Sequence, residues 1–239
     1  MKNIKDNEIL GLICARGGSK GLKNKNIKIF NSKPLIYWTI KIANKLKIIK
    51  KLYVSTDSKK IAKLSKKFGA EVPFLRPNKL ATDKSPEVYT WRHALKFFYK
   101  KYKYLPGILL VLPVTSPLRK KEDVIKCINL YKKTKSDAVI AVTESYRNPY
   151  FNMIFRDKKG ISKLIINSKK KITRRQDAPI TFDMTTVAFV INTKFILKKK
   201  NIFKGIVRSV IVNQESSIDI DNIKDFKIAE FLKKNIKIV

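Results

Sequence analysis

The chain has 239 residues, of which 44% are hydrophobic and 30% are charged. A chain of this length and composition can bury a core without disulfide or metal staples, which excludes a peptide hormone, a knottin and a disordered or collagen-like protein. The formal net charge is +36, from 54 Lys and Arg residues against 18 Asp and Glu residues. Such a charge is typical of proteins that bind nucleic acids or membrane surfaces.

The type of cation argues against a dedicated nucleic-acid-binding protein. Only 9 of the 54 basic residues are Arg and 45 are Lys, in a chain that also holds 32 Ile and 16 Asn. Recognition of phosphates and bases favours the forked guanidinium of Arg. A Lys, Ile and Asn excess spread along the whole chain is more typical of a compositional bias. Nucleic-acid binding stays open as an alternative, but we expect no specific nucleic-acid partner.

The cysteines and the first apolar segment indicate a cytoplasmic protein. Cys14 and Cys127 form neither a disulfide framework nor a zinc-binding set. The apolar stretch 9–15 is too short for a signal peptide or a membrane span. We therefore expect a reducing compartment and no membrane partner.

Buried strands alternate with amphipathic helices through the first 143 residues. Continuous apolar runs are typical of strands covered on both faces, and apolar residues at helical spacing are typical of helices packed on a sheet. The expected strands cover residues 9–15, 51–56, 108–112 and 137–142, and the expected helices cover residues 34–45, 57–69, 88–102 and 121–133. This alternation predicts a parallel sheet between two layers of helices.

The alternation breaks after residue 143. Residues 144–184 form short polar pieces with scattered aromatic residues, and we interpret them as an inserted excursion. Apolar residues return at 187–191, followed by a strand at 206–212 and a helix at 223–234. We therefore predict one α/β domain over residues 1–239, with a three-layer α/β/α architecture and a mostly parallel sheet.

The loop after the first strand is the strongest candidate for a ligand site. Residues 16–26 contain three glycines and four cations at the carboxyl end of a buried strand, where ligands bind in open α/β sheets. Glycines let backbone N–H groups approach an anion, and Arg16, Lys20 and Lys25 supply charge for phosphates. The spacing fits neither the dinucleotide-binding fingerprint nor the P-loop. A solvated basic loop is the alternative.

Two other segments are expected at the same edge of the sheet. Thr115, Ser116 and Arg119 follow a buried strand and suit a ribose, a phosphate or a sugar, although a helix cap with a proline turn explains them about equally well. Asp219 and Asp221 place two carboxylates on one side of an extended segment, where they could hold Mg²⁺. Capping of the last helix is the alternative for this pair.

The remaining polar candidates are less specific. Arg175 and Gln176 lie in the excursion, where a cluster with Arg174 could bind a carboxylate or be an ordinary exposed surface. The single histidine, His93, falls within a predicted helix and is expected to be packed or exposed. One histidine so placed provides no Ser/His/Asp or Cys/His arrangement.

Several motifs in a fixed order together resemble the acylneuraminate cytidylyltransferase family, which contains the CMP-sialic acid and other CMP-nonulosonate synthetases. The resemblance runs from about residue 9 to residue 231. It rests on Ala15-Arg16-Gly17-Gly18-Ser19-Lys20-Gly21-Leu22 with Lys25-Asn26, Val54-Ser55-Thr56-Asp57, Leu75-Arg76-Pro77, Leu80-Ala81-Thr82-Asp83, Thr115-Ser116-Pro117-Leu118-Arg119, Arg175-Gln176-Asp177 and Asp219-Ile220-Asp221.

The resemblance implies a Rossmann-like nucleotidyltransferase fold and a homodimer built by the excursion. The implied reaction joins CTP to a nine-carbon 2-keto sugar acid for cell-surface glycan synthesis and releases pyrophosphate. The implied roles are catalysis and triphosphate binding by Arg16 and Lys20, further nucleotide contacts from Gly17, Gly18, Ser19, Lys25, Asn26, Arg76 and Ser85, sugar contacts from Thr115, Ser116, Arg119, Arg175 and Gln176, and Mg²⁺ binding by Asp219 and Asp221, with Asp219 also catalytic.

Two departures from the family pattern concern the sugar. The family commonly has Gln-Pro before Thr-Ser-Pro-Leu-Arg, whereas this chain has Pro113 and Val114. The family often has Asn-Gly-Ala before an aromatic residue, whereas residues 183–189 read Asp-Met-Thr-Thr-Val-Ala-Phe. The acceptor is therefore left open between sialic acid, legionaminic acid and related sugars, and a different nucleotide-sugar nucleotidyltransferase is the alternative function.

Overall fold

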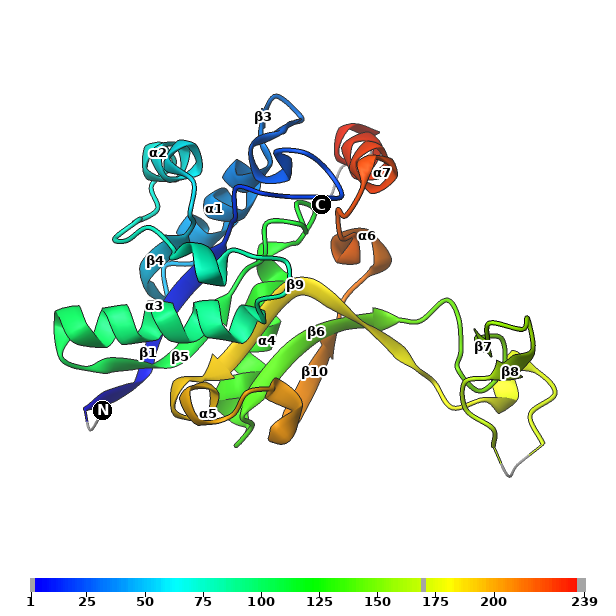
Figure 1. Cartoon of the computed structure of the whole chain (residues 1–239). Coiled ribbons are helices and arrows are strands. Elements are labelled where there is room, and N and C mark those ends of the chain that lie inside the picture. The colour runs from blue at the N-terminus through cyan, green and yellow to red at the C-terminus, as the bar shows by residue number, and fades with distance from the viewer. Residues whose placement is uncertain (1–2, 169–170, 236–239) are drawn as a thin grey trace.

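A six-stranded sheet forms the centre of the protein in this computed structural model, which describes residues 3–168 and 171–235 (Figure 1). All strands except β9 run in the same direction, since β9 pairs antiparallel with both of its neighbours. In spatial order the strands are β10 (Val207–Ile211), β6 (Ala138–Glu144), β9 (Phe182–Asn192), β5 (Leu105–Val111), β1 (Ile4–Cys14) and β4 (Ile49–Ser55).

Helices cover both faces of this sheet. One core forms where α1 (Leu35–Lys45), α2 (Lys59–Lys67), α4 (Lys121–Lys133) and α7 (Ile223–Asn235) pack on one face. A second core forms on the opposite face, under α3 (Glu87–Tyr102) and α5 (Thr193–Lys198). The predicted three-layer fold with a mostly parallel sheet is therefore confirmed, as are the strands and helices expected on either side of the excursion.

Small elements complete the connections between the main strands and helices. They are η1 (Lys25–Ile27), β2 (Ile29–Phe30) and β3 (Lys33–Pro34) before α1, η2 (Asn78–Leu80) before α3, and η4 (Ile202–Lys204) and α6 (Gln214–Ser217) around β10. The two-stranded β2–β3 turn explains why the loop before α1 is ordered although its sequence is polar. None of the helices that the structure describes has the length and apolar character needed to cross a membrane.

A two-stranded arm leaves the sheet within the predicted excursion. β6 and β9 stay paired as far as Glu144 and Phe182, and the chain between them carries the hairpin of β7 (Ile154–Arg156) and β8 (Ser162–Leu164) and the turn η3 (Arg175–Asp177). Figure 1 shows this arm projecting from one side of the molecule. The return of the chain from the arm makes β9 antiparallel to β6.

A bulge in β9 lies where the arm meets the sheet. Ile140 pairs with Phe189 and Val142 pairs with Met184, so a longer stretch of β9 faces a shorter stretch of β6. The hydroxyl of Thr185 in this stretch donates to the carbonyl of Ala141 at 2.9 Å. Bulges bend a strand and redirect its side chains, and here the bulge turns the next residue, Thr186, towards the loop after β5.

A substitution at Gly107 can test the close approach of β1 and β5. A Cβ atom at this position would collide with the backbone of Asp6, so Gly107→Ala is expected to lower the free energy of unfolding by about 2 to 3 kcal/mol through overpacking, measured by urea denaturation. Gly18→Ala is the matched control, because a Cβ there meets no atom within 4 Å. Equal stability of the two variants would contradict the close approach.

Candidate active site

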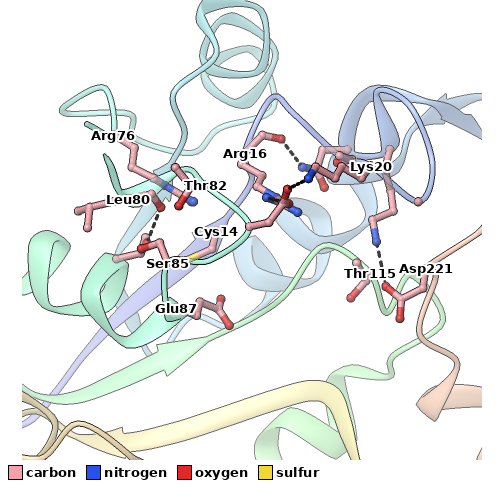
Figure 2. A pocket seen from close by; sticks show the side chains of 16 residues that line it. Cys14, Arg16, Lys20, Arg76, Leu80, Thr82, Ser85, Glu87, Thr115 and Asp221 are labelled. Carbon is pink, nitrogen blue, oxygen red and sulfur yellow. Dashed lines mark hydrogen bonds and ion pairs between the residues drawn. The ribbon is translucent and has the colours of Figure 1, made fainter. Parts of the chain in front are cut away.

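A cavity of about 470 Å³ opens at the carboxyl ends of β1 and β5 (Figure 2). This is the edge at which the sequence placed its polar loops, and it is the usual ligand position in open α/β sheets. The walls come from residues 16–26, called the glycine loop below, from residues 76–86 before α3, from the first residues of α3, and from the loops at Thr115 and Asp221. The lining residues are Cys14, Arg16, Ser19, Lys20, Gly21, Lys25, Asn26, Arg76, Leu80, Thr82, Asp83, Ser85, Glu87, Thr90, Thr115 and Asp221.

The glycine loop is fixed from below by two polar contacts. The N–H of Gly17 donates to the carboxylate of Asp57 at 2.9 Å, and the side-chain amide of Asn26 donates to the carbonyl of Arg16 at 2.9 Å. Neither Gly17 nor Gly18 lines the cavity, whereas Ser19, Lys20 and Gly21 do. Asn26 is buried, so its amide positions the loop at the same time as it faces the cavity.

The backbone of Ile220 joins three loops at one side of the cavity. Its N–H donates to the carbonyl of Thr115 at 2.9 Å, and its carbonyl accepts from Nζ of Lys25 at 2.6 Å. Lys25 also forms an ion pair with Asp221 at 3.2 Å. Gly21 lies so close that a Cβ atom there would collide with the carbonyl oxygen of Asp221. These contacts bring together the glycine loop, the loop after β5 and the acidic segment Asp219–Asp221, as the sequence predicts.

Asp83 forms ion pairs with two cations of the glycine loop. Its Oδ1 contacts the guanidinium of Arg16, and its Oδ2 lies 2.6 Å from Nζ of Lys20. These two cations hold the pKa of the Asp83 carboxyl below its usual range. Asp83 ends the Leu80-Ala81-Thr82-Asp83 motif, for which the sequence indicates no role.

Arg76 lies at the opposite end of the cavity from Lys20 (Figure 2). Arg76 is buried there, with Nε donating to the hydroxyl of Ser55 at 3.1 Å and Nη2 donating to its carbonyl at 2.5 Å. Desolvation raises the pKa of Glu87, while the nearby Trp91 and Cys14 side chains and the charge of Arg76 act in the opposite sense. Burial and the Glu87 charge raise the pKa of Cys14, so this thiol stays protonated at neutral pH.

Only part of the loop after β5 faces the cavity. Thr115 lines it, whereas Ser116 is buried with its Oγ 2.6 Å from Oγ1 of Thr186. Arg119 is 3% exposed and donates to the carbonyls of Pro113 and Thr186. Ser116 and Arg119 therefore fix the loop against the β9 bulge rather than line the space beside it.

The two predicted metal ligands differ in environment. Asp221 is exposed and lines the cavity, where it pairs with Lys25. Asp219 has a buried Oδ1 without a hydrogen-bond partner among the described residues, and it lies close enough to Arg119 to raise the pKa of that guanidinium against the lowering effect of burial. The described residues contain no group of three or more His, Cys, Asp or Glu side chains that could hold a metal ion.

Arg175 and Gln176 do not meet the other candidates within this chain. They line a separate cavity of about 320 Å³ on the arm, where Nη2 of Arg175 donates to the carbonyl of Ser145 at 3.0 Å. The guanidinium of Arg175 also lies over the ring of Tyr146, 5.8 Å from its centroid. His93 lines neither cavity and packs edge-on against Phe74, as expected.

Several residues of the cavity lined by Arg16 and Lys20, called the main cavity below, were not predicted from the sequence. Asp83, Glu87, Thr82, Leu80, Thr90 and Cys14 all line it without having been assigned a role. The sequence offered a signal for two of them: Cys14 is the next-to-last residue of the first predicted strand, at the ligand-binding edge, and Glu87 directly precedes the helix expected from residue 88. Asp83 carried none, because its partners lie more than 60 residues earlier in the chain.

Residues 10–238 match the sequence model of a protein family described as cytidylyltransferase. The chain belongs to the cytidylyltransferase family. One curated relative is the post-translational flagellin modification protein B of Campylobacter coli, 36% identical over 95% of each chain. Another is the CMP-N,N'-diacetyllegionaminic acid synthase of Campylobacter jejuni, 34% identical over 94% of each chain. The family resemblance noted from the motifs is confirmed.

The fold of this cytidylyltransferase is also found in a solved structure. A CMP:2-keto-3-deoxy-manno-octonic acid synthetase complexed with CTP superposes with a TM-score of 0.70, covering 95% of this chain and 98% of the other. The two sequences are only 12% identical, so this likeness supports the fold alone.

A substitution at Arg119 can test whether this residue anchors the loop after β5 in this cytidylyltransferase. Arg119→Met leaves the Pro113 and Thr186 carbonyls and the Asp219 carboxylate without their cationic partner, and removing one partner from a buried set of this kind costs about 3 kcal/mol. We expect that loss in the free energy of unfolding, measured by urea denaturation. Arg208→Met, on the exposed face of β10, is the control. A change in Arg119→Met no larger than in the control would contradict the anchoring role.

Proposed function

We propose that this protein transfers the CMP group of CTP to a nine-carbon 2-keto sugar acid and releases pyrophosphate, acting in the cytoplasm. The observation that carries the proposal is the main cavity of a cytidylyltransferase, with Arg16, Lys20 and Lys25 gathered at one end and Arg76 and Ser85 at the other. A legionaminic acid synthase among its relatives supports the choice of acceptor class.

The cavity suits a nucleotide with its triphosphate on the glycine loop. Arg16, Lys20 and Lys25 supply three positive charges, and the loop backbone can approach phosphate oxygens closely at Gly21. The cytosine would then lie towards Arg76 and Ser85. Arg76 is held by Ser55, so its position is fixed before the nucleotide arrives, and a prepositioned partner reduces the entropy lost on binding.

The reaction needs positioning and charge stabilisation more than a strong base. The anomeric hydroxyl of the sugar would attack the α-phosphate in line, and its proton would leave to solvent or a nearby carboxylate as the bond to pyrophosphate breaks. Arg16 and Lys20 would stabilise the charge on the departing pyrophosphate. A cavity with several fixed cations and no histidine on its walls agrees with such a mechanism.

We propose Asp219 and Asp221 as the carboxylates of a magnesium site. Asp221 is exposed in the cavity, and the buried Oδ1 of Asp219, two residues earlier, has no hydrogen-bond partner among the described residues. Mg²⁺ is usually held in such enzymes by one or two carboxylates together with substrate phosphates, so two acids suffice. Bound there, it would neutralise phosphate charge. Arg119 beside Asp219 would keep that carboxylate in place.

We propose that two copies of the chain associate through their arms. The arm exposes large apolar side chains, among them Tyr146 at 72%, Phe155 at 65% and Ile180 at 73% exposed, which is unusual for a monomer. We expect a second copy of the chain to cover this apolar surface, because Arg175 and Gln176 lie apart from the cavity of their own chain and could reach the cavity of a partner. In a twofold dimer each arm would supply these residues to the partner's site.

The first test is pyrophosphate release from the purified protein with CTP and Mg²⁺. We expect release only when CTP and one of a panel of nonulosonic acids are both present, with N,N'-diacetyllegionaminic and N-acetylneuraminic acids in the panel and the other nucleoside triphosphates as controls. Asp219→Asn should lower the rate about a hundredfold and weaken Mn²⁺ binding measured by electron paramagnetic resonance. Release with another nucleotide, or without any sugar, would refute the proposal.

The dimer is tested by complementation between two inactive variants. Arg175→Ala loses the arm contact and Asp219→Asn loses the metal carboxylate, so each homodimer should be inactive. Coexpression should restore about one quarter of the wild-type rate, since about half of the dimers are mixed and each mixed dimer has one intact site.

Sedimentation gives an independent measurement of the same dimer. Phe155→Asp on the arm should give monomers, whereas Phe203→Asp, an equally exposed aromatic residue outside the arm, should leave the dimer intact. Monomeric wild-type protein, or coexpressed variants that stay inactive, would show that the arm does not complete a second copy's site.

A further inference from the structure

We propose that Asp83 occupies the position of a phosphate group between Arg16 and Lys20 in the nucleotide-free protein, and that the triphosphate displaces it and releases residues 77–86 from the glycine loop. This inference rests on the proposed function, because it assumes that these two cations receive the triphosphate. It assigns Asp83 a role in nucleotide binding that the sequence motifs did not indicate.

The contacts of Asp83 resemble those of a bound phosphate. Its two carboxylate oxygens are divided between two cations, Oδ1 with Arg16 and Oδ2 with Lys20 at 2.6 Å. Both cations line the same cavity as Asp83, and the two ion pairs join the segment before α3 to the glycine loop. With its pKa held low by these partners, Asp83 is an anion at neutral pH. Asp83 therefore places a negative charge between Arg16 and Lys20, as a phosphate group would.

Residues 77–86 are otherwise weakly attached. None of them is buried, and Pro77 and Pro86 mark the two ends of the segment. Most of the backbone hydrogen bonds that the structure describes here are local, such as Leu80 to Pro77 and Ala81 to Asn78. The hydroxyl of Thr90 reaches the Leu80 carbonyl at a long 3.4 Å. Segments with few buried contacts open at low cost, so the two ion pairs of Asp83 are a large share of what holds this one closed.

Charge requires Asp83 to leave when the nucleotide binds. A triphosphate brings several negative charges to Arg16 and Lys20, and a carboxylate kept at the same distance would repel it. Lys25 is not released in this exchange, because its partners are Asp221 and the Ile220 carbonyl. Exchange of one carboxylate for at least two phosphate groups favours polyphosphates over single phosphates. The displacement of Asp83 would therefore favour binding of CTP over CMP, which lacks the pyrophosphate.

The test uses inorganic tripolyphosphate, which needs no recognition of cytidine. In the absence of Mg²⁺, isothermal titration should show that Asp83→Asn binds tripolyphosphate about three- to tenfold more tightly than wild type, because the competing carboxylate is gone while its shape is kept. Asp6→Asn, at the other end of β1, makes the same change in net charge far from the cavity and should leave the affinity within about twofold.

Hydrogen exchange measures the release of the segment directly. In wild type, tripolyphosphate should speed exchange at residues 78–85, and Asp83→Asn should show the faster exchange before any ligand is added. Weaker tripolyphosphate binding by Asp83→Asn would identify Asp83 as a residue that positions the cations and would overturn the inference, as would wild type that binds no tripolyphosphate. Pyrophosphate release from CTP and sugar could still be observed in either case, so the proposed function is tested separately.

Discussion

The active-site edge depends on a single backbone position, Ile220. Its N–H and its carbonyl bond to the loop after β5 and to Lys25 of the glycine loop, so three segments far apart in sequence share one fixed point. The side chain of Ile220 is fully buried, which prevents the acidic segment from sliding along the cavity. Asp219 and Asp221 therefore take opposite environments on either side of it: one faces Arg119 in the interior and the other faces the cavity.

Charge in this cavity is partly compensated before any ligand arrives. Arg16 and Lys20 share Asp83, and Lys25 is paired with Asp221, although the whole chain carries a net charge of +36. The large surface charge thus says little about the site, where Arg16, Lys20 and Lys25 each contact an acid. Binding of an anion here is an exchange of partners, and its selectivity follows from which acids can move and which are fixed by the fold.

Much of the fold could be predicted because its signals are local. Apolar runs and helical periodicity located the strands and helices, and the position of loops after parallel strands located the cavity edge. The burial of Arg119 could not be predicted from the sequence. It depends on a hydrogen bond to the carbonyl of Thr186, which lies 67 residues later in the chain. Asp83 and the β9 bulge were missed for the same reason: both depend on contacts between segments far apart in the sequence, which no spacing rule encodes.

The arm is joined to the sheet by only two strands, β6 and β9, and by the bulge at their junction. Residues between Ser145 and Thr181 can therefore be lengthened, shortened or replaced without altering the register of any strand pair in the six-stranded sheet. The strand register at the nucleotide-binding edge is in this sense independent of the length of the arm. Divergence among related chains would then be expected to accumulate in the arm, while the glycine loop and the acidic segment stay constrained by their shared contact at Ile220.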